Sequence, residues 1–247
     1  MNVTCYTDAV VQAHLDRAVA HHVATDVCAV IAAKQEAPSI GAVIERTRQY
    51  AGTIICVVGQ STDGTADVAA RHGALVLTDG GRGKGEALRR AIPHIRAPIV
   101  VFLDADGSHD PEDIPLLVGP ILEGESDHVT ASRLRGGSSE LHGGFDEFFR
   151  LAGSSFITAC INWRFGCRLS DSQNGFRAIR TSVLTTLDLR ENLTTIEQEM
   201  IIKTLRRGFR MTEVPSHEHP RLHGVSHIRV WRSAPHYGYS LVKYLFF

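Results

Sequence analysis

The stretch IVVFLDADGSHD at residues 99–110 decides how this chain folds. Its first five residues are apolar and mostly β-branched, which predicts a buried strand. Two carboxylates, Asp104 and Asp106, follow at once with one residue between them. Mg²⁺ prefers oxygen ligands and takes one or two carboxylates together with phosphate oxygens. We therefore expect Asp104 and Asp106 to bind Mg²⁺ or Mn²⁺. The alternative is a turn in which Asp110 caps a helix beginning at Pro111.

Around this stretch, short apolar runs alternate with amphipathic segments. The runs predict strands over residues 27–32, 53–58, 74–77 and 99–103. The segments between them predict one helix over 38–50, a second that starts with Thr65 as N-cap, and a third that follows the glycine-rich loop 80–85 and ends at Ile92. This repeat indicates right-handed crossover units and a Rossmann-like, mostly parallel central sheet flanked by helices. Ligands of such sheets bind beyond the carboxyl ends of the strands. The loops after Ala32, Val58 and Leu103 should therefore line the site.

The second half of the chain is less regular. It predicts helices and strands over these residues: helices 111–122, 145–165 and 195–207; strands 128–132, 176–180 and 210–214. No Pro/Gly/Ser-rich linker and no internal repeat divides the chain. We expect a single α/β domain over residues 26–229, preceded by a helical extension over 1–25 and followed by a helical tail over 230–247.

Composition narrows the classes of function. The formal net charge is −1, so no overall field attracts nucleic acid, and we expect no nucleic-acid partner. The five cysteines contain no C-x-x-C pair, which is typical of a reduced, cytoplasmic protein. No apolar run approaches the roughly 20 residues that span a bilayer. The apolar end YGYSLVKYLFF (237–247) leaves three readings open: peripheral contact with the cytoplasmic membrane face, packing on a neighbour, or the start of a longer chain.

Several ordered motifs accompany the acidic pair. A glycine-rich loop, GRGKG, occupies residues 81–85, and DSQNGFR occupies residues 171–177. Ser132-Arg133 is followed by two glycines, and Arg221-x-x-Gly-x-Ser ends at Ser226. Together these motifs resemble the inverting family-2 glycosyltransferases of the GT-A fold. Within that family the chain is most similar to the polyprenyl-phosphate branch, which includes dolichyl-phosphate mannose synthase. The resemblance covers residues 27–227.

The resemblance implies a nucleotide-sugar donor site. The family's Pro-x-x-Asn-Glu loop appears here without its proline but with Gln35 and Glu36, and Lys84 matches the lysine of the Gly-Lys-Gly loop. The donor-binding residues implied are Ala33, Gln35, Glu36, Gln60, Asp63, Lys84, Asp104, Ala105 and Asp106. The family's acidic pair before Ser-x-Asp-Gly-Thr is replaced by Val58 and Gly59. Gln60 is the candidate to take over its role.

The resemblance also implies a cradle for an acceptor phosphate. Guanidinium groups bind phosphate oxygens bidentately, and the family's arginines match residues of this chain. The acceptor-phosphate residues implied are Arg133, Arg150, Arg177, Arg221 and Ser226. The family's lysine after that serine is His227 here. Each arginine taken alone is more simply a solvated surface charge.

Asp171, Asp106 and Arg133 are the implied catalytic residues. A phosphate acceptor is already anionic and needs no general base, so Asp171 would orient the sugar or the arginines. With a hydroxyl acceptor, Asp171 would be the base. The structural alternative is a buried carboxylate that pairs with Arg177 or caps a turn.

The expected function is metal-dependent, inverting transfer of a sugar from a UDP- or GDP-linked donor to a polyprenyl or dolichyl phosphate. Three alternatives remain: the same chemistry on a soluble sugar, small metabolite or peptide; a nucleotidyltransferase; or a sugar-nucleotide binding protein without activity. The His-rich segment over 216–227 is either a lid or, through His217 or His219, an additional metal ligand.

Overall fold

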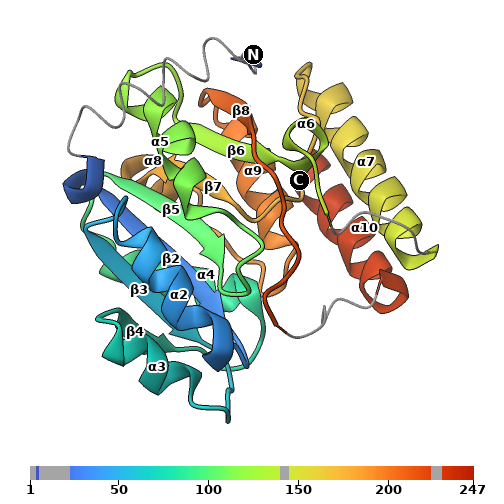
Figure 1. Ribbon diagram of the computed structural model, residues 1–247. Coiled ribbons are helices and arrows are strands. Elements are labelled where there is room, and N and C mark those ends of the chain that lie inside the picture. Colours follow the sequence, from blue (N-terminus) through green and yellow to red (C-terminus); the bar gives the residue numbers. More distant parts are fainter. Residues whose placement is uncertain (1–3, 6–22, 140–144, 224–229) are drawn as a thin grey trace.

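The computed structural model describes residues 4–5, 23–139, 145–223 and 230–247 (Figure 1). Within them, an eight-stranded sheet has the order β1-β8-β6-β7-β5-β2-β3-β4. The strands are β1 (Thr4–Cys5), β2 (Val27–Ala33), β3 (Thr53–Val58), β4 (Leu75–Thr78), β5 (Ile99–Asp104), β6 (His128–Ser132), β7 (Arg177–Arg180) and β8 (Met211–Pro215). The helices are α2 (Ala37–Thr47), α3 (Thr65–Arg71), α4 (Lys84–Ala91), α5 (Ile114–Leu122), α6 (Arg133–Gly136), α7 (Phe145–Phe165), α8 (Thr181–Thr186), α9 (Ile196–Arg206) and α10 (Val230–Phe246). Short 3₁₀ turns are η1 (Val23–Asp26), η2 (Ile92–His94) and η3 (Pro111–Asp113). The predicted single-domain α/β fold class is confirmed.

The sheet lies between two helical layers because alternate side chains of its strands point to opposite faces. On β2, Val27, Ala29 and Ile31 join a core with side chains of α2 and α5. The side chains between them, Cys28 and Val30, join a second core with α4, α8 and α9. Burial of β2 on both faces explains its uniformly apolar sequence. Its carboxyl end lies level with those of β3 and β5, since Ala33 pairs with Val58 and Ala32 with Asp104.

One strand runs against the rest. β7 lies between β5 and β6 and is antiparallel to both, with Arg177 opposite Phe102 and Thr130. The loop before β7 therefore reaches the same edge of the sheet as the loops after β5 and β6. Sequence pattern predicted this strand but not its direction, because a buried strand is apolar in either direction.

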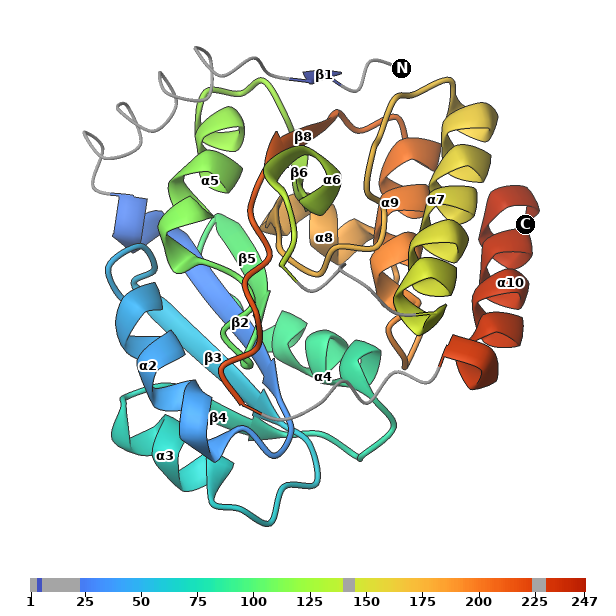
Figure 2. The same cartoon turned by 45° about the vertical axis from the view of Figure 1, so that its right-hand side comes forward.

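A third core joins the outer side of α9 to α7 and α10, and these two helices lie beside the sheet rather than on it (Figure 2). α10 packs its inner side chains, Leu241, Tyr244 and Leu245, against this core. The predicted tail is thus a helix that contacts the body of the protein. None of the described helices is long and apolar enough to cross a membrane.

Two details differ from expectation at helix and chain ends. Thr65 is not an N-cap: Gly64 precedes α3 with a φ of 86°, and Thr65 is its first residue. Near the amino end, Thr4–Cys5 form a strand parallel to β8 rather than part of a helix. The rest of the helix expected over residues 1–25, up to the start of η1, lies outside the described residues.

Candidate active site

The acidic turn after β5 presents its two carboxylates differently. Asp106 is 4% exposed, and its Oδ1 accepts hydrogen bonds from the Ser108 amide (3.0 Å) and hydroxyl (2.7 Å). These bonds fix the Asp106 carboxylate, whose Oδ2 lies 2.9 Å from Arg221. Asp104 instead uses Oδ1 to pair with Lys84. Within the described residues no donor reaches Asp104 Oδ2. The predicted cap is also present, because Asp110 accepts from the Glu112 amide before η3.

Lys84 bridges two carboxylates across the site. Its Nζ lies 2.6 Å from Asp104 Oδ1 and 2.9 Å from Glu197 Oε1. Burial alone would lower the pKa of Lys84, but the charges of Asp104 and Glu197 raise it above its usual value. Burial opposes the charged form of Asp104 as well, yet Lys84 brings the pKa of that carboxyl to about 2. Lys84 and Asp104 are therefore both ionised at neutral pH.

Close packing of glycines brings Lys84 to this position. A Cβ on Gly85 would lie 2.4 Å from the carbonyl oxygen of Glu191, and one on Gly83 would lie 2.7 Å from that of Asn192. The loop can approach the chain before α9 only because these side chains are absent. Gly175, in the loop before β7, leaves room for the ammonium itself, since a Cβ there would lie 2.5 Å from Lys84 Nζ.

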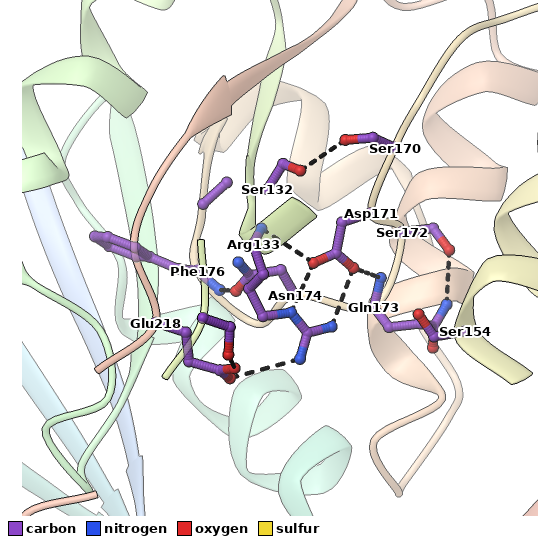
Figure 3. Close-up of polar contacts among 12 residues, drawn as sticks. Ser132, Arg133, Ser154, Ser170, Asp171, Ser172, Gln173, Asn174, Phe176 and Glu218 are labelled. Carbon is purple, nitrogen blue, oxygen red and sulfur yellow. Dashed lines mark hydrogen bonds and ion pairs between the residues drawn. The ribbon is translucent and has the colours of Figure 1, made fainter. Parts of the chain in front are cut away.

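A second cation bridges two carboxylates on the other side of the site (Figure 3). Arg133 Nε donates to Asp171 Oδ2 at 2.6 Å and its Nη2 to Asp171 Oδ1 at 3.1 Å. Its Nη1 lies 3.5 Å from Glu218 Oε1. Asp171 is 1% exposed; burial opposes its charge, but Arg133 lowers its pKa below the usual value. The partner of Asp171 is thus Arg133, not Arg177.

Arg177 does not face an acceptor, which corrects the expectation for that residue. It is 1% exposed, its Nη1 donates to the Glu197 carbonyl at 2.9 Å, and its Nη2 donates to the Asn174 carbonyl. Burial lowers its pKa to about 10. Arg177 joins the loop before β7 to the start of α9, and so holds Glu197 in place beneath Lys84.

The other expected phosphate ligands divide into two groups. Arg150 lies near the start of the described side chains of α7, directly after Phe149. It lines the same cavity as Arg133 and Arg221. Ser226 lies outside the described residues, as does His227.

Several expected donor-binding residues have structural roles instead. The Asp63 carboxylate accepts from the Ala37 amide at 2.9 Å and from the Thr65 amide at 3.0 Å, so it joins the starts of α2 and α3. Slight burial opposes its charge, but these hydrogen bonds lower its pKa. The Gln35 side chain exchanges hydrogen bonds with Thr62. Asp63 and Gln35 thus shape the donor loops, and their polar atoms are already engaged.

Burial and proximity describe three further residues that are expected to bind the donor. Ala33 and Ala105 are 5% and 2% exposed, so their side chains do not reach a ligand. Glu36 is half-buried, and its carboxylate accepts from the Ser39 hydroxyl. Burial raises its pKa, and the charges of Asp106 and Asp104 add to this effect, so Glu36 lies near the acidic turn.

The segment after β8 crosses the acidic turn, as the lid reading of the His-rich stretch expects (Figure 1). The amide of His219 donates to the Ser108 carbonyl, and that of Leu222 donates to the Asp106 carbonyl. The two predicted extra ligands point elsewhere: His217 bonds to Ser139, and His219 Nε2 lies 3.7 Å from Asp110. His109 stacks on Phe176 inside the site at 5.1 Å.

Sequence reasoning missed Glu197 and Glu218, the second partners of Lys84 and Arg133. Glu197 lies in the first turn of α9, where an acidic residue is ordinary. Glu218 lies among histidines in an irregular segment. No spacing in the sequence connects either residue to its cation.

These groups surround one cavity of about 490 Å³. Its polar end contains Lys84, Asp104, Arg133, Arg150 and Arg221. Its other end lies between α7 and α10 and is apolar. The apolar lining includes Phe149, Ala152, Gly153, Phe156, Ile157, Ala234, Tyr237, Gly238 and Leu241.

The donor set fits a hard divalent cation. Asp104 Oδ2 is without a donor among the described side chains, and Asp106 Oδ2 faces Arg221, whose charge a cation can replace. Both are carboxylate oxygens from one turn, as Mg²⁺ and Mn²⁺ prefer. In the described part of the chain, no group of three or more His, Cys, Asp or Glu side chains forms a more complete metal site.

A mostly parallel sheet with an acidic pair and a basic glycine loop at its carboxyl edge is the arrangement of the GT-A fold. Residues 28–188 match the family described as Glycosyl transferase family 2. The chain therefore belongs to that family.

Curated relatives agree with this assignment. The chain is 32% identical over 200 residues to glycosyltransferase AglJ of Haloferax volcanii, which covers 80% of this chain and 64% of AglJ. It thus spans less than two thirds of AglJ. It is 29% identical over 193 residues to the dolichyl-phosphate hexose transferase of the same organism, covering 77% of this chain and 81% of the relative. The resemblance to the polyprenyl-phosphate branch is confirmed.

Solved structures share the fold. Glucosyl-3-phosphoglycerate synthase from Mycobacterium tuberculosis, in complex with Mn²⁺, uridine diphosphate and phosphoglyceric acid, superimposes with a TM-score of 0.72. The two are 24% identical, and the match covers 94% of this chain and 81% of that one.

Proposed function

We propose that this protein transfers a sugar, with inversion, from a nucleoside diphosphate sugar to a polyprenyl phosphate. The observation that carries the proposal is the cavity of about 490 Å³ with one cationic and one apolar end. A soluble phosphorylated metabolite would need the cationic end alone. An amphiphile with a phosphate head and an isoprenoid chain uses both ends.

The exposed surface beside the apolar end is consistent with a lipid acceptor. Phe149, Phe156 and Trp163 recur every seven residues along α7 and are 38%, 65% and 76% exposed. Tyr239, Val242 and Phe246 are exposed on α10, which lies beside α7 (Figure 2). Aromatic side chains suit the boundary between apolar chains and water. Peripheral contact of this surface with a membrane belongs to the same proposal.

The cationic end suits an acceptor that needs no base. A phosphate is ionised at neutral pH, so the nucleophile is already formed. Arg150 and Arg221 are the proposed phosphate ligands together with Arg133, whose bidentate pair fixes Asp171. Asp171 uses both oxygens for Arg133 and accepts the Gln173 amide. We therefore assign Asp171 to orienting Arg133 rather than to proton removal.

Asp104 and Asp106 are the proposed holders of a divalent cation, which would neutralise charge on the donor diphosphate. Lys84 would place a second positive charge at the leaving group. In the ligand-free protein Lys84 is held by Asp104 and Glu197, and thus is already positioned before the donor arrives.

Filling the apolar end tests the proposal. A Cβ added at Gly153 meets no atom within 4 Å, and Gly153 is exposed on α7, so Gly153→Leu should fold and narrow the cavity. We expect the rate of transfer to a short polyprenyl phosphate to fall by roughly tenfold or more. The added leucine would displace part of the isoprenoid chain, and a loss of about 1.4 kcal/mol of binding in the transition state lowers the rate tenfold. Ala159→Leu, on the same helix but outside the cavity lining, is the matched control.

The assay uses UDP- and GDP-sugars with Mg²⁺, and polyprenyl phosphate or 3-phosphoglycerate as acceptor. The proposal would be wrong if the enzyme transferred sugar to 3-phosphoglycerate but not to the lipid, and if Gly153→Leu left that rate unchanged. The soluble alternative would then replace it. Release of pyrophosphate from a nucleoside triphosphate would indicate a nucleotidyltransferase instead.

A further inference from the structure

The carboxyl ends of β2, β3 and β4 meet at Gly59, the residue after β3. The Gly59 amide donates to the Ala33 carbonyl at 2.8 Å, which continues the pairing of β3 with β2. On the other side, the Asp79 amide donates to the Val58 carbonyl at 3.1 Å. Gly59 and Asp79 therefore lie side by side at the edge of the sheet where ligands of such folds bind.

Asp79 lies in van der Waals contact with the position that a Cβ at residue 59 would occupy. A Cβ on Gly59 would lie 3.4 Å from Asp79 Oδ2 and 3.6 Å from Oδ1. Gly59 has no left-handed φ, unlike Gly64 and Gly81. Its backbone thus does not require glycine, and a side chain placed there would extend beside the Asp79 carboxylate.

The Asp79 carboxylate is fixed by one oxygen. Its Oδ1 accepts from the Gly81 amide at 2.7 Å, which forms an Asx turn at the start of the glycine-rich loop. Among the described residues, no donor reaches Oδ2 and no cation pairs with Asp79. A half-buried carboxylate with a fixed orientation and an unused acceptor is suited to receive a ligand N–H or O–H.

The position of Asp79 along the sheet edge indicates which part of a donor it would meet. Strands lie about 4.8 Å apart, so the ends of β3 and β4 are roughly 10 to 14 Å from the end of β5. Asp104 and Lys84, the proposed diphosphate site, are at the end of β5. This is the reach from the diphosphate to the nucleoside in an extended nucleotide.

We propose that Asp79 recognises the nucleoside of the sugar donor, by accepting a hydrogen bond from a base N–H or a ribose hydroxyl. The inference rests on the proposed function, because it assumes a nucleotide donor. No acid follows β3 directly in this chain, because Val58 and Gly59 carry no polar side chain. Asp79, directly after β4, would provide the carboxylate at this edge of the sheet. Asp79 is thereby a specificity-determining residue, and Gly59 is its structural counterpart.

Asp79→Asn tests the role directly. Asparagine retains an oxygen for the Gly81 amide but replaces the acceptor at Oδ2 by a donor. In calorimetric titrations with Mg²⁺ and either UDP or GDP, whichever the wild type binds more tightly, we expect affinity to fall roughly tenfold to hundredfold. Binding of inorganic pyrophosphate, which has no nucleoside, should remain unchanged.

A relocated acid provides the second test. Gly59→Asp alone places two carboxylates in contact and should also weaken nucleotide binding. In the background of Asp79→Ser, whose hydroxyl can still accept from Gly81, the Gly59→Asp change should restore binding. Recovery in the double variant excludes simple misfolding as the cause of the single-variant losses.

Three results would overturn the inference. Nucleotide affinity of Asp79→Asn equal to wild type would show that Oδ2 contacts no ligand. An equal loss of pyrophosphate affinity would show that Asp79 only shapes the glycine-rich loop. Failure of the wild type to bind any nucleotide, with pyrophosphate still bound, would overturn the proposed function and this inference together; the first two results leave the proposed function intact.

Discussion

Two cations flank the cavity, and each bridges two carboxylates. Lys84 lies between Asp104 and Glu197, and Arg133 lies between Asp171 and Glu218. Lys84 is a point charge that leaves one oxygen of Asp104 without a donor among the described residues. Arg133 takes both oxygens of Asp171 with a planar fork. Asp104 is therefore available to a ligand, whereas Asp171 is committed to structure.

The largest expected effect on the transfer rate follows substitution of Asp104. Asp104→Asn should reduce the rate of sugar transfer by roughly 100- to 1,000-fold, since it removes charge at the diphosphate site. Initial rates with Mg²⁺ measure this. Asp110→Asn, which removes a charge beside Arg46 and His219 but leaves Asp104 in place, should retain a rate near wild type. Equal losses of transfer rate in the two variants would show that Asp104 has no special role at the diphosphate site.

Substitution of the committed acid should affect stability more than ligand binding. Asp171→Asn leaves Arg133 largely buried beside Glu218 alone, and should lower the free energy of unfolding by about 3 kcal/mol. Because the folded-state pKa of Asp171 is below its ordinary 3.8, the stabilisation it gives is complete above pH 3.8. It is lost as pH falls through the folded-state value.

Urea unfolding of wild type and Asp171→Asn measures that difference at pH 7 and at successive values below 3.8. The gap should narrow as acid protonates Asp171 in the wild type. Asp104→Asn is the comparison variant and should be less destabilised, since Lys84 keeps Glu197 at 2.9 Å whereas Arg133 keeps Glu218 only at 3.5 Å. A gap that persists unchanged in acid would contradict the ionic explanation.

The smallest effect should follow a change that displaces Lys84 without removing it. Gly175→Ala adds a Cβ that would lie 2.5 Å from Lys84 Nζ. The long side chain can shift, so we expect only a roughly tenfold lower rate, or about 1.4 kcal/mol. Gly153→Ala, where the added atom meets nothing within 4 Å, is the control in the same assay.

The regular half of the fold could be predicted because its signals are local. β3, β6 and α7 begin and end at the predicted residues, since apolar periodicity and the turn residues beside it act over a few positions. The acidic turn and the glycine-rich loop could be placed together because both follow the expected order of strands and helices.

The charge partners could not be predicted because they depend on tertiary packing. Glu197 reaches Lys84 only after α9 covers the sheet, and Glu218 reaches Arg133 only after the segment beyond β8 crosses the acidic turn. Asp63 and Arg177 show the converse. Their motif positions suggested ligands, but the fold engages their polar atoms with backbone groups.

The reversed direction of β7 has a consequence for redesigning this enzyme. A parallel strand offers a designer the loop that follows it, whereas β7 brings the loop that precedes it to the cavity. Loop exchange intended to change the acceptor should therefore replace residues 172–174, upstream of the strand, and leave Asp171 in place. The turn after β7, where the Thr181 amide donates to the Pro98 carbonyl, lies at the opposite edge of the sheet, and insertions there would lengthen the molecule far from its chemistry.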